Sequence, residues 1–402
     1  MSSTDPTKPM LSLFAASGDQ RVYFEALSDA LTARGVAAHC VFYKSLPKLR
    51  WLIDCFRPLP THVVERIDQQ VSILQARKEL VRSKSPLGWW LFRRLARLRA
   101  RALYCQARDW LKSESVAYLG LWNGKKFRQA VVVIAAEELG VPVLYFETGP
   151  LPGYSVADPV GVDFYAGIPR ELDFYRAFSC ALDKEELIHI PAAPRPDGLP
   201  EQYVFVPLQV LEDSNIYLHS PWVRNMRHLY ELIYRFVERH PDRHFVLKPH
   251  PACPERYEDL YLRHANIHFV TDMPTTSLVQ HAKAVVTINS TVGMEALLVN
   301  KPVIVLGQAI YGIDGLTRPV QSFEQFEQAL RHLNGCQPNS DDVAQFLCFL
   351  QSAYAVPGDA MQSPDKAHWD GMAQKVKAFL KGDQQACIGT NPSSAERKRL
   401  AL

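Results

Sequence analysis

Short apolar runs alternate with amphipathic segments along the first half of the chain. Strands are predicted at 10–16, 37–43, 116–122 and 141–147, with helices at 19–35 and 125–140. Strands that alternate with helices are typical of a parallel sheet covered by helices on both faces.

The same alternation resumes after a proline-rich stretch at 190–200, which is unsuited to a helix interior or a central strand. Beyond it, strands are predicted at 203–209, 244–250, 267–272, 284–288 and 302–307, with helices at 220–240 and 291–299. We therefore expect an α/β protein in which two Rossmann-like domains face each other across a cleft.

The predicted domains are 1–195 and 200–360, with the proline-rich stretch as their linker. A helix within 361–381 should cross back to the first domain, and the polar tail 382–402 should be loose. The apolar stripe of that helix consists of Trp369, Met372, Val376 and Phe379.

Composition places the chain among ordinary globular proteins. Its 402 residues are 47% hydrophobic and 22% charged, and the formal net charge is only +3, which argues against nucleic-acid binding by the chain as a whole. The first residues lack the basic-then-apolar order of a signal peptide, and no apolar run approaches the ~18 residues of a membrane span. We therefore expect a cytoplasmic protein.

The cysteines predict neither a disulfide framework nor a metal site. None forms a CxxC pair or stands at zinc-ligand spacing beside a histidine. We expect them to be reduced and mostly buried, and we expect no metal or other cofactor. The eight positions are 40, 55, 105, 180, 253, 336, 348 and 387.

Three hydrogen-bonding side chains, Asn289, Ser290 and Thr291, follow the apolar run 284–288 and precede a short helix. The first turn of a helix leaves backbone N–H groups unpaired, and the helix dipole favours negative charge there. These residues predict a phosphate site. The alternative is a plain N-cap, for which one such side chain suffices.

Lys248 and His250 stand in the sequence LKPHP, where the strand that begins near His244 ends. A cation and an imidazole held by flanking prolines form a stiff, positively charged turn. Such a turn can bind a phosphate or a leaving group that gains negative charge. The alternative is a surface turn with an incidental histidine.

Two carboxylates also follow predicted strands. Asp213 comes after the strand 203–209, near Gln209, and is a candidate nucleophile or base. Glu147 ends the strand 141–147 and precedes a loop rich in glycine and proline, which leaves it beside open space. The alternatives are a cap or turn for Asp213 and a capping or salt-bridged role for Glu147.

Ligands of open α/β sheets bind beyond the carboxyl ends of the strands, so we expect these side chains to line one cleft. Two carboxylates beside a cationic phosphate site predict a nucleotide-activated group transfer. The chain contains no GxxxxGK[ST] and no GxGxxG after its first strand, which argues against a P-loop NTPase and a dinucleotide enzyme.

The motifs FETG, QVLED, KPHP, NST and GQAIYGIDGLT occur in this order, and they resemble those of the capsule polysaccharide biosynthesis family. The resemblance spans roughly residues 115–320 and extends to KpsS- and KpsC-like members and to WbbB-type enzymes. It implies a GT-B fold and a β-Kdo transferase that uses CMP-Kdo as donor without a metal. The implied acceptor is lipid-linked or an oligosaccharide of capsule or O-antigen.

Carried over residue by residue, the resemblance implies a role for each candidate. Asp213 would be the nucleophile that forms a covalent Kdo adduct, and Glu147 would assist the acceptor hydroxyl. Retention of configuration needs two inversions, hence a nucleophile as well as a base. His250 would serve both catalysis and donor binding, and the other residues expected at the donor are Gln209, Lys248, Asn289, Ser290, Thr291 and Glu295.

Two other functions remain open at this point. An inverting sialyltransferase would use the same CMP site but only one general base. A non-catalytic protein of capsule assembly or export would keep the same shell, although it would have no use for polar side chains at the strand ends.

A basic segment bears on the acceptor. Between Arg77 and Arg101 nine Lys or Arg residues accompany one acid, Glu79, and Trp89 and Trp90 stand in the middle. A basic helix with tryptophans can rest on an anionic membrane surface, which would place the protein peripherally at the inner membrane face. The alternative is a solvated basic helix whose apolar side packs on the first domain.

Overall fold

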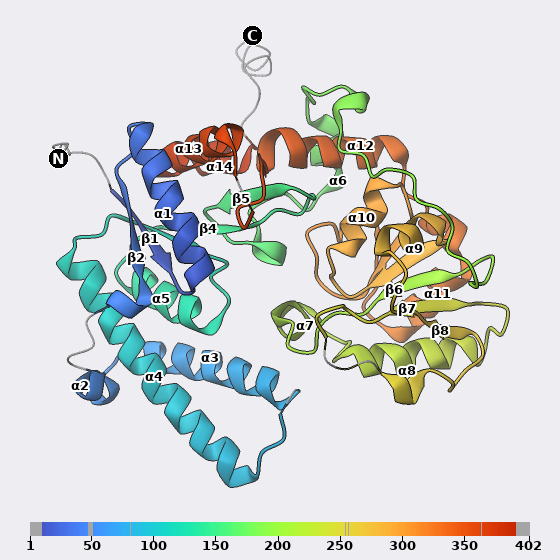
Figure 1. Cartoon of the computed structure of the whole chain (residues 1–402), viewed down its shortest axis with the longest axis horizontal. Coiled ribbons are helices and arrows are strands. Elements are labelled where there is room, and N and C mark those ends of the chain that lie inside the picture. The colour runs from blue at the N-terminus through green and yellow to red at the C-terminus, as the bar shows by residue number, and fades with distance from the viewer. Residues whose placement is uncertain are drawn as a thin grey trace. The chain divides into compact units, whose positions relative to one another are not determined.

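The computed structural model describes residues 10–46, 51–80, 82–253, 255, 257–362 and 364–390. It divides into two units, each built on its own six-stranded sheet (Figure 1). Unit 1 takes the chain up to Ile168 and from Ala353 onward, and unit 2 runs from Pro169 to Ser352. Both sheets are largely parallel and covered by helices, which confirms the predicted α/β class with two Rossmann-like units.

Unit 1 begins with two parallel strands around a helix and ends with helices from the C-terminal part of the chain. Its sheet has the order β12-β5-β4-β3-β1-β2. The strands β2, β1, β3 and β4 are parallel. At one edge, β5 pairs antiparallel with β4, and β12 pairs antiparallel with β5. The elements are β1 (Leu11–Ala15), α1 (Gly18–Ala33), β2 (Ala38–Phe42), η1 (Tyr43–Ser45), α2 (Trp51–Phe56), α3 (Thr61–Glu79), α4 (Pro86–Ser113), β3 (Tyr118–Trp122), α5 (Phe127–Glu138), β4 (Val143–Thr148), β5 (Tyr154–Asp158), η2 (Asp163–Tyr165), β12 (Val356–Pro357), α13 (Lys366–Leu380) and α14 (Gln384–Ile388).

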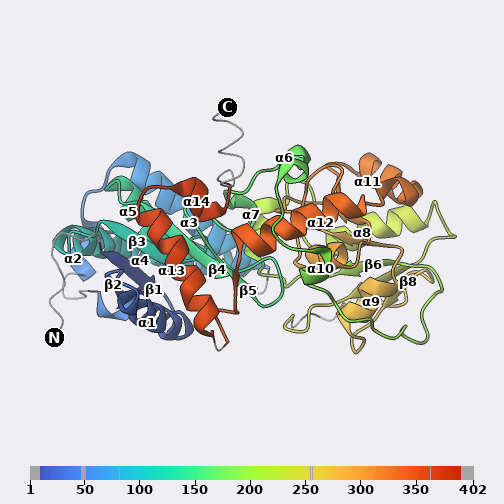
Figure 2. The same cartoon turned by 90° about the horizontal axis from the view of Figure 1, so that it is seen from above.

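Helices cover both faces of this sheet. One buried apolar cluster joins β1 and β3 to α4 and α5, and a second joins the opposite face to α1 and α13. Helix α13 lies over the sheet of unit 1 (Figure 2). Its residues Met372, Val376 and Phe379 are buried and Trp369 is partly buried, as the apolar stripe predicted. An ion pair between Arg34 and Asp370, 2.7 Å apart, also holds α13 to the end of α1.

The C-terminal segment is more ordered than its polar composition suggests. Residues 384–388 form α14, whose Cys387 is fully buried. The Nζ of Lys375 on α13 donates to the carbonyl oxygens of Cys387 and Ala353, each at 2.6 Å. The expectation of a loose tail therefore does not hold for 384–390, and the rest of that tail, 391–402, lies outside the described residues.

Unit 2 holds an all-parallel sheet of order β11-β10-β9-β6-β7-β8. A buried apolar cluster joins β6, β7 and β9 to α8 and α11. The elements are α6 (Leu172–Ala177), η3 (Lys184–Glu186), β6 (Val204–Pro207), α7 (Ser214–His219), α8 (Met226–Val237), β7 (Phe245–Lys248), η4 (Glu258–Leu260), β8 (Ile267–Phe269), α9 (Thr275–His281), β9 (Ala284–Thr287), α10 (Val292–Leu298), β10 (Val303–Val305), β11 (Arg318–Pro319), α11 (Phe323–Arg331), η5 (Leu333–Cys336) and α12 (Ser340–Phe349); a short π-helical stretch, η6 (Leu350–Tyr354), follows.

The boundary between the units differs from the expected linker. Unit 2 begins at Pro169, because the segment after it packs on α12: Arg176 pairs with Asp342 at 2.8 Å, and the Tyr175 ring packs edge-on against Phe346. The proline-rich stretch 190–200 lies within unit 2, where it hydrogen-bonds to α9.

Two further expectations need correction. The segment predicted as one helix over 220–240 contains α8 alone, which begins after Asn225, since the Asn225 side chain caps it by accepting from the His228 N–H at 2.8 Å. The cysteines are not all reduced, because Cys180 and Cys348 form a disulfide that ties the segment after α6 to α12.

None of the helices in the described ranges is both long and apolar enough to cross a bilayer.

Candidate functional site

The sheet of unit 2 changes its direction of growth between β6 and β9. From β6 the chain adds β7 and β8 on one side, whereas β9, β10 and β11 lie on the other. In open α/β sheets, ligands bind at such a switch point, beyond the carboxyl ends of the strands. Gln209 follows β6 and Asn289 follows β9, so both border this point.

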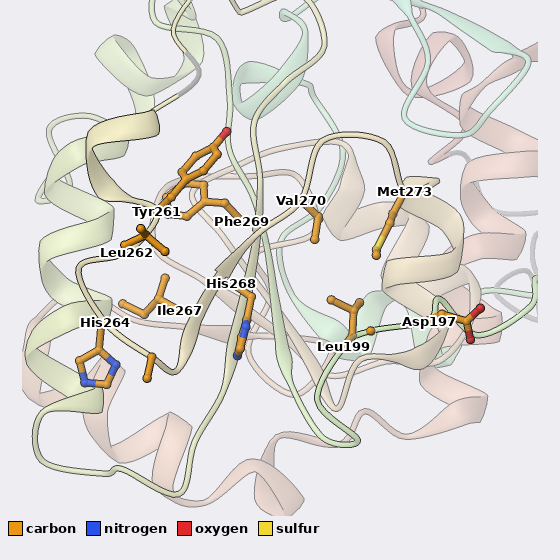
Figure 3. A pocket seen from close by; sticks show the side chains of 12 residues that line it. Asp197, Leu199, Tyr261, Leu262, His264, Ile267, His268, Phe269, Val270 and Met273 are labelled. Atoms are coloured by element: carbon orange, nitrogen blue, oxygen red, sulfur yellow. The ribbon is translucent and has the colours of Figure 1, made fainter.

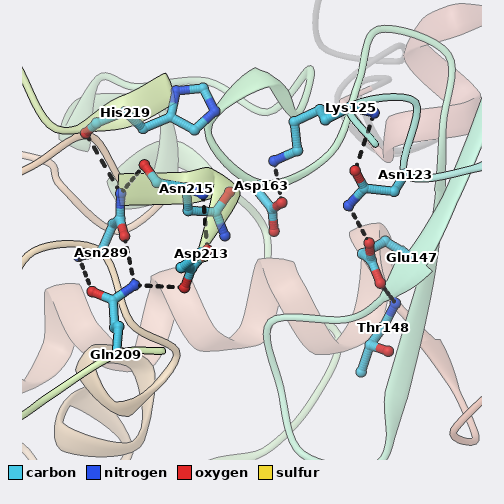
Figure 4. Close-up of polar contacts among 10 residues, drawn as sticks. All are labelled: Asn123, Lys125, Glu147, Thr148, Asp163, Gln209, Asp213, Asn215, His219 and Asn289. Atoms are coloured by element: carbon cyan, nitrogen blue, oxygen red, sulfur yellow. Dashed lines mark hydrogen bonds and ion pairs between the residues drawn. The ribbon is translucent and has the colours of Figure 1, made fainter. Parts of the chain in front are cut away.

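Gln209 joins the two loops at the switch point (Figure 4). Its Nε2 donates to Oδ1 of Asn289 at 3.0 Å and to Oδ2 of Asp213 at 2.9 Å. The side chain is only 5% exposed, so these hydrogen bonds have no ready replacement by water. The structure thus brings together three predicted site residues from two strand ends.

Asp213 also caps the short helix α7. Its Oδ1 accepts from the backbone N–H of Asn215 at 2.8 Å, while Oδ2 accepts from Gln209. This is the capping role considered as the alternative, and the structure shows it directly. A nucleophilic role is compatible with it, since the side chain is partly exposed and each carboxylate oxygen keeps a further lone pair.

The three polar residues after β9 have different surroundings. Asn289 donates from Nδ2 to the carbonyl oxygen of Asn215 at 2.9 Å and so holds α7 in place. The Ser290 hydroxyl accepts from the Val292 N–H at 3.3 Å, an ordinary local turn. Thr291 is exposed at the start of α10 and makes no capping bond. Thr291 is thus exposed, whereas Asn289 and Ser290 are partly buried.

Lys248, at the end of β7, faces the next loop rather than open solvent. Its Nζ donates to the carbonyl oxygen of Met273 at 2.6 Å and to Oγ1 of Thr275 at 3.0 Å. Burial lowers the pKa of Lys248, and the carboxylate of Glu295 opposes that effect. Burial likewise raises the pKa of Glu295, and Lys248 opposes it. The predicted phosphate ligand is therefore already engaged in holding the loop before α9.

His250 lies two residues beyond Lys248 and is exposed. Its Nδ1 accepts from the Ala252 N–H at 3.1 Å, so the neutral ring carries its proton on Nε2. The exposed nitrogen is then a donor, which suits an anionic ligand.

Glu147 ends β4 of unit 1 and sits in a polar cluster of its own (Figure 4). One carboxylate oxygen accepts from Nδ2 of Asn123, and the other accepts from the Thr148 N–H at 2.9 Å. Lys125 pairs with Asp163 beside it. Burial raises the pKa of Glu147 and the negative charge of Asp163 adds to it, whereas the hydrogen bond from Asn123 opposes the rise.

The backbone around Glu147 departs from the conformations that most residues prefer. Asn123, Gly124 and Asp163 all have positive φ angles, of 62°, 76° and 54°. A side chain at Gly124 would meet the Tyr145 ring at 2.5 Å, so the turn requires glycine both for its φ and for its space. Such local strain gathers at functional sites more often than elsewhere.

A pocket of about 610 Å³ lies elsewhere in unit 2, along the edge strand β8 (Figure 3). Its walls include Leu199, Tyr261, Phe269 and Met273. None of the predicted site residues lines it. The candidate site therefore lies at the strand ends and not in this pocket.

Sequence reasoning missed several members of these clusters. Asn123 and Lys125 follow β3 in the sequence WNGKK, and the rule that directed attention to other strand ends applies to them equally. Asn215 and Thr275 have no comparable signal, because the first takes part through its backbone and the second through a bond to Lys248.

Comparison with known proteins gives a consistent assignment. A family model described as "Capsule polysaccharide biosynthesis protein" matches residues 192–338. Protein FixF of Sinorhizobium fredii (strain NBRC 101917 / NGR234) is 32% identical over 256 residues, which cover 61% of this chain and 61% of FixF. Capsule polysaccharide export protein KpsS of Escherichia coli is 39% identical over 129 residues, 30% of this chain and 33% of KpsS. The chain thus spans less than two thirds of these relatives.

Among solved structures, the chain is similar to Thermosulfurimonas dismutans KpsC, beta Kdo 2,7 transferase. The two share 18% sequence identity with a TM-score of 0.41, over 67% of this chain and 87% of that one. Residues 192–338 therefore match the capsule polysaccharide biosynthesis family, and the names of two of the curated relatives refer to capsule polysaccharide as well.

Proposed function

We propose that this chain is a retaining glycosyltransferase that transfers β-Kdo from CMP-Kdo to a lipid-linked or glycan acceptor in capsule or O-antigen synthesis. The observation that carries the proposal is the position of the donor-side residues. All eight, from Gln209 to Glu295, fall within the region 192–338 that matches the capsule family, and three of them meet at the switch point of one sheet.

In this proposal Asp213 is the nucleophile. One of its carboxylate oxygens attacks the anomeric carbon of Kdo while the bond from that carbon to the phosphate oxygen breaks, and CMP leaves with the electron pair. The acceptor oxygen then attacks the same carbon and releases the Asp213 carboxylate, so that two inversions give retention. The hydrogen bonds from Gln209 and Asn215 support this role, because they fix the direction of the carboxylate.

The leaving CMP gains negative charge on its phosphate, and the residues after β7 and β9 are proposed to bind it. Both His250 and Thr291 are exposed residues, and they offer an Nε2–H and a hydroxyl. Lys248 has two of its three ammonium protons engaged, which leaves one for a ligand. Glu295, Asn289 and Ser290 are proposed to support the same site from α10 and its approach.

Glu147 is proposed to take the proton of the acceptor hydroxyl. A general base works best when its pKa lies near the working pH, and an ordinary glutamate titrates well below it. Burial and the charge of Asp163 raise the pKa of Glu147, so its environment shifts it in the direction that the role requires.

We propose that the acceptor is lipid-linked or a glycan of a surface polysaccharide. The names of the relatives refer to capsule polysaccharide export and to Kdo transfer, which supports a surface glycan as the product. We propose a cytoplasmic location, where a CMP-activated sugar would serve as donor without a metal or other cofactor.

Intact mass spectrometry tests the central step. The full chain is incubated with CMP-Kdo in the absence of acceptor, and we expect one added Kdo mass on the peptide that contains Asp213. Asp213→Asn should form no adduct and should still bind CMP, because asparagine is an equally good helix N-cap. The matched control is Glu212→Gln, which removes the neighbouring carboxylate and should retain the adduct.

Other outcomes would redirect the assignment. An adduct that persists in Asp213→Asn would remove Asp213 as nucleophile. Turnover of CMP-sialic acid in place of CMP-Kdo, with no adduct, would indicate an inverting sialyltransferase. Failure to bind or turn over either nucleotide sugar would favour a non-catalytic capsule protein.

A further inference from the structure

The N-terminal half of α4 exposes an apolar stripe. Leu87, Trp90, Leu91 and Leu95 are 72%, 52%, 50% and 45% exposed, and their spacing of three and four residues puts them on one side of the helix. Large apolar side chains at such spacing are normally buried against another element. Here they remain exposed on α4, which lies beside α3 (Figure 1).

Packing onto the sheet of unit 1 does not account for this stripe. The buried residues of α4 include Ala96, Ala100 and Ala107, which join the core with α5. At 3.6 residues per turn they lie on the opposite side of the helix from Leu91 and Leu95. The helix therefore has two apolar faces, one for its own core and one that the described part of the chain leaves uncovered.

Positive charge surrounds the exposed stripe. No acidic residue occurs between Leu80 and Arg108. The Arg94 guanidinium stacks on the Trp90 ring, 4.4 Å from its centre. Arg97 is engaged by Asp68, and Arg93 donates to the Ser72 hydroxyl at 3.2 Å. The basic residues Arg82, Lys84 and Arg99 are exposed as well.

The helix α2, which packs against α4, also exposes large apolar side chains. It is held to α4 by Arg101, whose guanidinium donates to the carbonyl oxygens of Cys55 and Arg57 at 2.9 and 2.7 Å. Ile53 and Phe56 on α2 are 61% and 73% exposed. The acid of this helix, Asp54, is only 2% exposed, so α2 adds apolar surface without exposed negative charge.

We propose that the outer face of α4, with α2 beside it, binds the surface of an anionic phospholipid bilayer. Leucine and tryptophan side chains would enter the boundary between headgroups and acyl chains, and the arginines and lysines around them would bind lipid phosphates. Charge complementarity selects this occupant, because a protein partner would have to supply many carboxylates to match a face that has none. The inference does not depend on the proposed chemistry.

Vesicle flotation with the full chain tests the proposal without any sugar nucleotide. We expect binding to vesicles of phosphatidylcholine with about 30% phosphatidylglycerol, and much weaker binding to phosphatidylcholine alone. Each surface charge contributes about a fivefold factor, so Arg82→Gln with Arg99→Gln should weaken binding roughly 25-fold. Trp90→Ala with Leu91→Ala should weaken it at least tenfold, because the apolar area that enters the bilayer is lost.

Exposed residues away from this face provide matched controls. Val22→Ala on α1 and Arg331→Gln on α11 remove an exposed apolar and an exposed basic side chain, and both should bind vesicles as the wild type does. Binding to anionic vesicles that is absent, or equal in all variants, would overturn the proposal. So would a wild-type dimer that Trp90→Ala with Leu91→Ala makes monomeric, because a second copy would then cover the face.

Discussion

Gln209 offers a direct test of the network at the switch point. Gln209→Met keeps the length of the side chain and removes both N–H donors. The bond to the charged Asp213 contributes about 1.5–3 kcal/mol and the bond to Asn289 about 0.5–1.5 kcal/mol. Asp213 is partly exposed, which favours the lower end for its bond. We expect the free energy of unfolding of unit 2 to fall by about 2–3 kcal/mol, and its Tm by roughly 4–12 °C.

Calorimetry on the full chain measures this change, since it separates the transitions of different units. Gln308→Met is the matched control: Gln308 is exposed, and its backbone N–H, which donates to the His219 carbonyl oxygen, is kept. A cycle that combines Gln209→Met with Asp213→Asn should give a coupling energy of about 1–2 kcal/mol. If Gln209→Met lowers the Tm no more than Gln308→Met does, the network does not stabilise the site and the reasoning fails.

Three further predictions concern unit 1. Glu147→Gln should lower kcat about 10²–10⁴-fold with CMP binding unchanged, and an unaltered kcat would end its assignment as base. Because the charge of Asp163 helps to raise the pKa of Glu147, Asp163→Asn should move the acid limb of the pH profile of kcat to lower pH; a limb that stays in place would contradict this coupling. Burial lowers the pKa of Lys375 to about 8, so between about pH 8 and pH 10 the unfolded chain binds more protons and stability rises with pH. Urea unfolding should show that the free energy of unfolding of the wild type rises by about 2 kcal/mol from about pH 7.5 to about pH 9.5, and that of Lys375→Met should not rise. If the free energy of unfolding depends on pH equally in both proteins, the ammonium of Lys375 is not buried as described.

The strands β1 to β4 and β6 to β10 were predictable because each lies in a short apolar run, whereas β5, β11 and β12 were not predicted. The ends of β6 and β9 illustrate this: Gln209 and Asn289 stand where buried strands give way to polar sequence, and strand order makes them neighbours. What the pattern could not give is strand order itself. The antiparallel edge formed by β5 and β12 brings together segments about 200 residues apart.

Other features depend on partners that leave no mark in the sequence. Lys248 was predicted as a phosphate ligand from its place after a strand, yet its ammonium donates to the Met273 carbonyl oxygen, a partner that no side-chain pattern reveals. The disulfide joins Cys180 and Cys348, which are 168 residues apart and follow no spacing rule. The start of α8 was misplaced because Ser220 with Pro221 is a credible helix start, and only the fold shows that Asn225 makes the capping bond.

The two candidate carboxylates differ in a way that fits different tasks. Both oxygens of Asp213 accept a hydrogen bond, one from Gln209 and one from the Asn215 N–H, so the direction of the carboxylate is fixed while the residue remains partly exposed. Glu147 lies instead beside a second acid, Asp163, whose charge adds to the effect of burial in raising the pKa of Glu147. A nucleophile depends above all on orientation toward the carbon it attacks, whereas a base depends on its affinity for a proton. Two acids whose surroundings give them different pKa values commonly have different catalytic roles. The surroundings of Asp213 and Glu147 agree in this way with the roles of nucleophile and base proposed for them.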